Sequence, residues 1–141
     1  MMSELAENYY RNLVLSIKCR KAGNRIILAK PIFVLAILET IANNQDNHNV
    51  FQFEGELKKQ YSYFCEKYKC TAPYYYPFYH LEHDGFWHLC WRDGVAMDCK
   101  SNKYLSENIR FGYLDMSFWT LLQKEDNRDY FKSIIINNFS L

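Results

Sequence analysis

The sequence predicts an α+β fold: a mostly helical single domain that spans residues 1–141 and contains a small antiparallel β-hairpin. Two patterns lead to this fold class. Apolar residues recur at helical spacing along most of the chain, whereas one aromatic stretch surrounds an Asp-Gly turn of the kind that joins two strands. A length of 141 residues suits one ordinary domain, and 49% hydrophobic residues can fill one core. This composition excludes a disordered or low-complexity chain.

Two helices are expected in the first third of the chain. Residues 3–17 carry an apolar stripe at a spacing of four residues, and residues 18–29 are expected to form a basic connection. Lys30-Pro31 opens the second helix, because proline in the first helical turn loses no hydrogen bond. The apolar run from Ile32 to Leu38 predicts that this helix is buried on nearly all sides.

The middle of the chain combines a third helix with the predicted hairpin. The polar segment Asn43–Asn49 is expected to be a loop, and Glu54–Tyr68 a helix with one apolar face. The aromatic segment Tyr74–Leu81 is expected to be extended. It is expected to pair, across the turn His83-Asp84-Gly85, with a strand at Phe86–Trp91.

The last third is expected to be mainly helical. Val95–Met97 could add a third short strand, and Ser101–Asn108 a short helix or turn. Asp115 is a good N-cap for a helix that runs through Leu122, because aspartate accepts hydrogen bonds from the first free N–H groups. A final helix is expected to start at Asp126.

Charge is distributed unevenly along the chain. The net charge of +1 is not that of a strongly basic nucleic-acid binder. The segment Asn8–Leu38, however, has six basic residues and no acidic residue, while the remaining residues carry eleven basic and sixteen acidic groups, a net charge of −5. Such a segment is either a solvated face or an edge that faces phosphates. The six basic residues are Arg11, Lys18, Arg20, Lys21, Arg25 and Lys30.

The cysteines and the apolar runs favour a cytoplasmic protein without a membrane partner. Five cysteines are an odd number, and no secretory signal precedes them, so we expect free thiols in a reducing compartment. The longest apolar run, Ile32–Leu38, is too short to cross a bilayer.

Metal-binding and catalytic patterns are weak. The spacing of two cysteines and three histidines loosely permits zinc, but core thiols and surface imidazoles are the favoured interpretation. Cys90 as a nucleophile would need a base and an orienting group. We therefore expect no metal, no cofactor and no catalytic residue, and a small zinc- or thiol-dependent enzyme is kept as an alternative. The candidate zinc ligands are Cys65, Cys70, His80, His83 and His88.

The aromatic segment Tyr74–His80 favours nucleic-acid binding more strongly. Pro73 and Pro77 stiffen it, and a stiff apolar segment beside cationic side chains can receive a phosphate group or a base. The alternative is that these aromatic residues fill the core, as we expect of Phe78.

Three segments resemble, in the same order, motifs of one bacterial family. Lys30-Pro31 with Ile32–Leu38 resembles its helix start "(H/K/R)-P-L-L-L-L-A-L-L". Tyr76–Leu81 followed by Asp84–Trp87 resembles its "Y-P-F-x-x-L … D-G-x-W", and Glu107–Leu122 resembles its "Y-A-x-L-D-x-x-L/F-W-x-L-L". The family is the sulfur-binding domain of phosphorothioation-dependent restriction endonucleases, and the likeness covers essentially the whole chain. In that family the domain usually precedes a nuclease domain of the HNH type.

The resemblance implies binding of double-stranded DNA in which sulfur replaces one non-bridging phosphate oxygen. The chain would then be the targeting module of a restriction system, with an HNH-type nuclease on another domain or subunit. Sulfur is more polarisable and more weakly hydrated than oxygen, so an apolar socket favours it by roughly 1–2 kcal/mol. The phosphate charge still requires cations nearby.

The resemblance also implies a set of site residues. Tyr76 and Pro77 would form the apolar wall of the sulfur socket, Lys30 its cation, and His80 its rim. Ala29 stands where family members often carry histidine, and His80 is larger than a residue that would leave the socket open. A DNA-binding domain that is indifferent to sulfur is the main alternative. Further contacts to phosphates or bases are expected from Arg20, Lys21, Arg25, Lys100 and Lys103.

Overall fold

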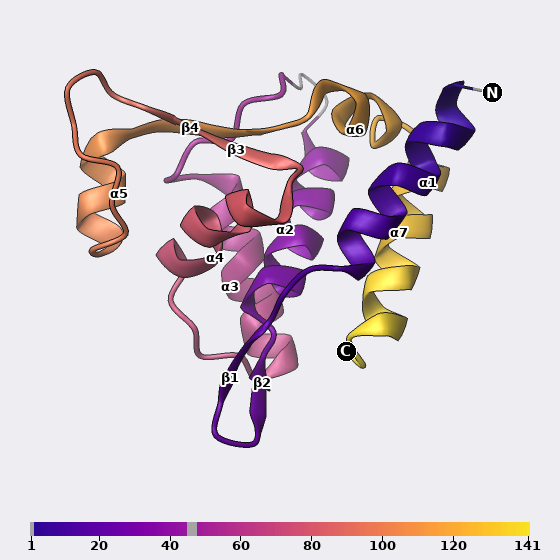
Figure 1. The fold of residues 1–141 in the computed structure, drawn as a ribbon, viewed down its shortest axis with the longest axis horizontal. Helices are drawn as coiled ribbons and strands as arrows, with labels where there is room; N and C mark the ends of the chain where they lie inside the picture. Colours follow the sequence, from indigo (N-terminus) through magenta and orange to yellow (C-terminus); the bar gives the residue numbers. More distant parts are fainter. Residues whose placement is uncertain (1, 45–47) are drawn as a thin grey trace.

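Helices dominate the computed structural model, which describes residues 2–44 and 48–141 (Figure 1). Within these residues there are seven α-helices, one 3-10 helix and two separate two-stranded antiparallel sheets, so the α+β class is as predicted. The loop expected at Asn43–Asn49 includes residues 45–47, which lie outside the described part. The helices are α1 (Met2–Leu15), α2 (Ala29–Asn43), α3 (Glu56–Tyr68), α4 (Tyr75–His80), η1 (Leu81–Asp84), α5 (Asn102–Asn108), α6 (Met116–Leu121) and α7 (Glu125–Asn138). The strands are β1 (Arg20–Ala22), β2 (Arg25–Ile27), β3 (Trp87–Trp91) and β4 (Ile109–Leu114).

Helix α2 is buried on nearly all sides, as its sequence predicts. The Ile32 N–H donates to the Leu28 carbonyl (3.1 Å), so Pro31 lies in the first turn, where its missing N–H costs no hydrogen bond. The helix packs against α3, α4 and α7, and the hydrophobic core forms around it. No helix of residues 2–44 or 48–141, α2 included, combines the length and the apolar character needed to cross a bilayer.

Residues 18–29, expected to be a basic connection, form the β1–β2 hairpin instead. Gly23-Asn24 joins the strands, and Gly23 has a φ of 65°, which glycine adopts without steric cost. A Gly-Asn pair between two short runs is typical of a two-residue hairpin loop, so the sequence did carry this signal. The hairpin protrudes at the bottom of Figure 1, and all its strand residues except Ile27 are exposed.

Strand β3 is in the predicted place, but the prediction of its partner is wrong. It pairs with β4, from Trp87 opposite Leu114 to Trp91 opposite Ile109. Between the two strands the chain passes through α5, so the Asp84-Gly85 turn ends η1 and closes no hairpin. The strand expected at 95–97 is not formed: residues 92–101 contain a turn and irregular structure but no strand.

The aromatic segment 74–81 is helical rather than extended. It forms α4, which continues directly into η1. Pro77 is the third residue of α4, where helical N–H groups have no partner within the helix. Proline is tolerated there, whereas in a strand it would remove a ladder hydrogen bond. Pro77 therefore fits a short helix better than it fits a strand.

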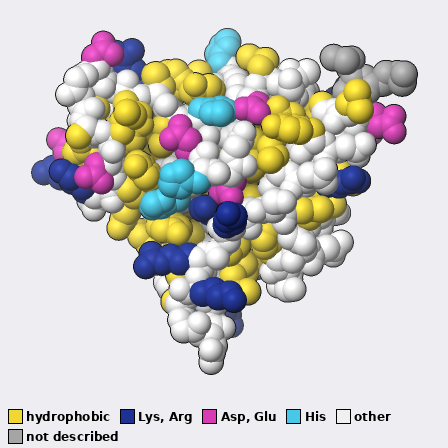
Figure 2. All heavy atoms as spheres, in the orientation of Figure 1, with side chains coloured by type: hydrophobic (Ala, Val, Ile, Leu, Met, Phe, Trp, Pro, Cys, Tyr) yellow, Lys and Arg dark blue, Asp and Glu magenta, His cyan; other side chains and the backbone are white. Residues whose placement is uncertain are grey.

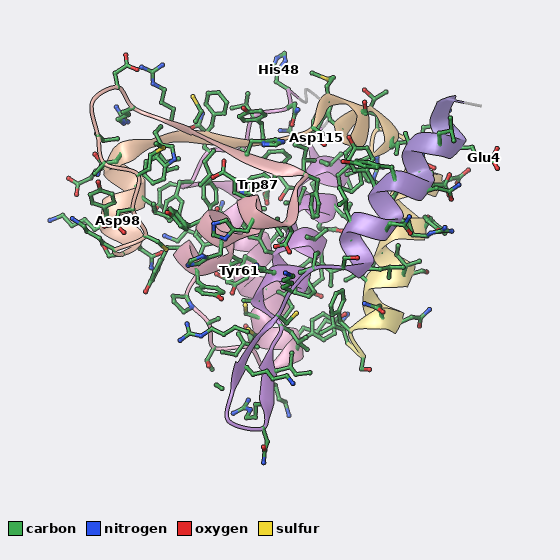
Figure 3. All side chains as sticks on the ribbon, viewed as in Figure 1. Glu4, His48, Tyr61, Trp87, Asp98 and Asp115 are labelled. Atoms are coloured by element: carbon green, nitrogen blue, oxygen red, sulfur yellow. The ribbon has the colours of Figure 1, made fainter. Side chains whose placement is uncertain are left out.

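Asp115 lies at the N-cap position of α6, as predicted, but its carboxylate does not cap the helix. It accepts a hydrogen bond from the Tyr10 hydroxyl (2.9 Å) and contacts Nε2 of His88. Asp115 therefore links α1 to the β3–β4 sheet at the place marked in Figure 3. Burial, together with the Asp115 carboxylate, raises the pKa of Tyr10 to about 12.

Candidate nucleic-acid interface

The core holds α4 in place by its buried face. Phe78 is fully buried, and its ring lies edge-to-face against Phe33 and Trp87 at centroid distances of 5.9 and 5.4 Å. The Trp87 indole N–H donates to the Phe78 carbonyl (2.8 Å), which ties α4 to β3 inside the molecule (Figure 3). These contacts leave Tyr76 and His80, both half-buried, at the surface.

Asp84, at the end of η1, joins three segments beside α4. Its Oδ2 accepts a hydrogen bond from Lys30 Nζ (2.8 Å), and its Oδ1 accepts one from the Lys18 backbone N–H (3.1 Å). The side chains of Lys30 and Asp84 are only 10% and 6% exposed. Lys30 therefore lies close to the predicted socket, but its charge is already paired.

Four side chains from two segments form a continuous row at the surface, which we call the aromatic–basic row. The Arg20 guanidinium carbon lies 5.9 Å from the centre of the Tyr76 ring, within the range of a cation–π contact. The Tyr76 ring contacts the His80 ring at a centroid distance of 4.5 Å. The His83 ring continues the row, 5.7 Å from that of His80. Two predicted socket residues, Tyr76 and His80, are thus in contact.

His80 lies in a positive environment. Burial lowers the pKa of His80, and the positive charges of His83, Lys30 and Arg20 lower it further. A protonated His80 is therefore disfavoured in the free protein. An anion that docks at the row would oppose these charges and favour the protonated form.

Pro77 and Ala29 differ from what the resemblance implies. Pro77 is buried, so its ring offers little surface as a socket wall. Ala29 is fully buried at the start of α2, so this position contributes no polar contact in place of the histidine. The open surface is formed by Tyr76 and His80, with Arg20 at its edge.

The β1–β2 hairpin extends the row with further cations. Arg25 lies opposite Ala22, and Ile27 lies opposite Arg20, so both arginines are on one face of the hairpin and Lys21 is on the other. None of the three cations forms an ion pair with a carboxylate among the described residues. Figure 2 shows histidine atoms beside basic atoms, and below them a tapered end without acidic atoms on the visible face.

Lys100 and Lys103 lie apart from this surface. Lys100 Nζ is 5.1 Å from the Tyr104 ring centre and 4.0 Å from an Asp98 carboxylate oxygen. Lys103 is exposed on α5, which Figure 1 draws well apart from the β1–β2 hairpin. At that edge of Figure 2, basic and acidic atoms are mixed. The structure therefore does not bring these two lysines to the row.

His83 and Asp84 were missed as members of this region. Once α4 and η1 are known to be helical, the spacing of three between His80 and His83 predicts one common face. The sequence places Asp84 in a turn and in the "D-G-x-W" motif, without a role in the site. No local pattern in the sequence indicates its pairing with Lys30, 54 residues away.

The candidate zinc ligands fall into separate places. Cys65 and Cys70 lie at the end of α3, His80 and His83 in the row, and His88 on β3. Within residues 2–44 and 48–141, no group of three or more histidine, cysteine or acidic side chains is arranged to hold a metal ion.

No protein-family description matches the chain, and no curated protein is significantly similar to it. The likeness to the sulfur-binding domain therefore stays a prediction from the motifs.

Proposed function

We propose that this chain binds double-stranded DNA and recognises a phosphorothioate in its backbone. The observation that supports this most strongly is the aromatic–basic row beside an exposed hairpin with three unpaired cations. A two-stranded ribbon fits the major groove of B-DNA, and cations along it can neutralise the flanking phosphates. The chain acts as a recognition module, and cleavage belongs to a nuclease domain or subunit of the HNH type.

The row suits sulfur for a physical reason. The Tyr76 ring and the half-buried His80 ring are flat, polarisable surfaces that offer dispersion contacts to sulfur. The Arg20 guanidinium, within cation–π distance of the Tyr76 ring, would neutralise the remaining charge of the phosphate. Arg20 thus takes the part that the resemblance gives to Lys30, whose charge Asp84 already neutralises.

A second candidate is DNA binding that is indifferent to sulfur. The burial of Pro77 favours it, because half of the implied apolar wall is then closed in the free protein. For either function we propose a cytoplasmic location, since all five cysteines are free thiols.

A paired titration separates the two candidates. Matched duplexes with and without a single Rp phosphorothioate are titrated with the full chain at several salt concentrations, and binding is followed by fluorescence anisotropy. We expect tighter binding of the sulfur duplex by about five- to thirtyfold, the equivalent of roughly 1–2 kcal/mol. Equal affinities would leave only the sulfur-indifferent function, and no binding to either duplex would reject both.

Two variants assign the roles within the row. Tyr76→Ala should reduce the preference for sulfur more than the affinity for ordinary DNA, because it removes the polarisable surface. Arg20→Gln should weaken binding to both duplexes, because it removes a cation. Lys132→Gln on α7 serves as the charge-matched control and should leave both affinities unchanged. If Tyr76→Ala weakens both duplexes equally, the sulfur contact lies elsewhere.

A further inference from the structure

The end of α3 brings two cysteines together. Lys69 adopts the left-handed conformation (φ 57°), and the Cys70 N–H donates to the Cys65 carbonyl across the helix end (2.9 Å). This is a Schellman closure, in which the side chains of these two positions commonly touch. Because the backbone hydrogen bond spans the pair, the two Cα atoms lie within about 7 Å, close to the range that a disulfide bridges.

The residues around Cys65 and Cys70 fix the position of this segment and shift the pKa of both thiols. Tyr61, labelled in Figure 3, donates to the Ala72 carbonyl (2.9 Å) and holds the segment after Cys70 against α3. A hydrogen bond with the Cys65 thiol lowers the pKa of Cys70; burial opposes this effect, and the Ala72 backbone adds to it. The same thiol–thiol hydrogen bond raises the pKa of Cys65, as does burial.

Cys70 is also reachable from a cavity. A space of about 300 Å³ lies between the β1–β2 hairpin and the segment after α3, and Cys70, Tyr68, Leu28 and Arg25 are among its lining residues. Cys70 is a half-buried residue that lines this space, so a small oxidant can approach it from this side. By contrast, burial raises the pKa of Cys19 and of Cys99.

We propose that Cys65 and Cys70 form a dithiol site that small hydroperoxides oxidise to a disulfide. Cys70, which lines the cavity, is the thiol that is oxidised first, and Cys65, across the Schellman closure, is the resolving thiol. The proposal does not rest on DNA recognition, since neither cysteine belongs to the aromatic–basic row, although Arg25 of the hairpin lines the same cavity.

Oxidation of the Cys65–Cys70 pair takes two steps. The Cys70 thiolate attacks one peroxide oxygen, the O–O bond breaks, and a sulfenic acid forms while the other oxygen leaves as alcohol or water after taking up a proton. The Cys65 sulfur then attacks the Cys70 sulfur, forms the S–S bond and expels water. Two thiols are oxidised, and one hydroperoxide is reduced.

Hydrogen peroxide and mass spectrometry test the site on the full reduced chain. We expect the loss of two hydrogen atoms, restored by dithiothreitol. Trypsin cleaves after Lys67 and Lys69, so the new disulfide should join two otherwise separate peptides that contain Cys65 and Cys70. Peroxide should consume Cys70 about tenfold faster than Cys19 or Cys99, because the thiolate is the reactive form.

Single variants separate the two roles. In Cys65→Ser the resolving thiol is missing, so a Cys70 sulfenic acid should accumulate and be trapped by dimedone. Cys70→Ser should abolish the disulfide, and Cys90→Ser, the matched control, should leave it unchanged. The proposal is overturned if the wild-type chain forms no 65–70 disulfide, or if Cys19, Cys90 or Cys99 reacts as fast as Cys70. The wild-type measurement decides this even where a variant fails to fold.

Discussion

Lys30 carries a positive charge in a position where that charge needs a partner inside the protein. It lies in the first turn of α2, where the helix dipole disfavours a cation, and its side chain is 10% exposed. The Asp84 carboxylate, 2.8 Å away, compensates the charge and at the same time binds the backbone of Lys18. Lys30 is therefore first a structural residue that joins α2, η1 and the chain entering β1. Any contact with phosphate would compete with Asp84.

Replacing Lys30 should consequently affect the fold before it affects DNA. Lys30→Met removes one partner of a nearly buried pair and leaves Asp84 unpaired, which should lower the free energy of unfolding by about 3–5 kcal/mol. The double variant Lys30→Met/Asp84→Asn should recover most of this loss, since asparagine still accepts the Lys18 N–H. Urea unfolding followed by circular dichroism measures both. A single variant as stable as the wild type would mean that the pair contributes no stability.

His80 makes DNA binding depend on pH under the proposed function. In the free protein, burial and the neighbouring cations lower the pKa of His80. A phosphate at the row opposes those cations and raises the pKa of His80, so His80 takes up a proton when DNA binds. The affinity for DNA should therefore rise as pH falls from about 7.5 to 5.5. The rise is at most about tenfold per pH unit for one proton. Titrations across this range should show it.

Two histidine variants test this pH dependence, one in the row and one control away from it. His80→Gln should bind with an affinity that changes much less with pH. His48→Gln should keep the wild-type profile, because His48 is exposed and lies at the top of Figure 3, away from the hairpin. An unchanged profile in His80→Gln would place the titrating group elsewhere.

At the scale of elements, the long helices could be predicted and the short pairings could not. The apolar periodicity of α2, α3 and α7 gave their positions within two residues. Strand β3 pairs with β4 through residues that lie 18 (Trp91 and Ile109) to 27 (Trp87 and Leu114) positions apart in the sequence, and no local signal encodes such a pairing. Helix α4 was mistaken for a strand because six aromatic-rich residues are too few to show a period. Tyr76 and His80 were nevertheless found, since the motif does not depend on their backbone conformation.

The β3–β4 sheet requires glycine at one position. A Cβ built at Gly112 would overlap the Trp87 indole, which is fully buried and donates to the Phe78 carbonyl on α4. Gly112→Ala should therefore destabilise the fold by about 1–3 kcal/mol or more. Arg110→Ala on the same strand, with an exposed side chain, should stay within about 0.5 kcal/mol. Thermal unfolding compares them, and equal stabilities would show that the indole can move aside.

At the scale of the whole molecule, charge is segregated although the net charge is only +1. The cations of the hairpin lie unpaired at one tapered end, whereas Lys100 lies near Asp98, and Arg110 near Asp93 at 3.5 Å. The net charge is thus close to zero, although one end of the molecule is positive and the rest of the visible face carries both basic and acidic side chains (Figure 2). Such segregation orients a molecule toward a polyanion more than total charge does.

The salt dependence of binding tests which end meets DNA. Each lost phosphate contact lowers the slope of log affinity against log salt by about 0.9 on duplex DNA. The triple variant Arg20→Gln/Lys21→Gln/Arg25→Gln should therefore flatten the slope by up to roughly three on ordinary and sulfur duplexes alike. Lys100→Gln/Lys103→Gln should change it little, because α5 lies away from the hairpin. If the α5 pair flattens the slope and the hairpin triple does not, DNA binds at the α5 edge, and the aromatic–basic row is not the interface.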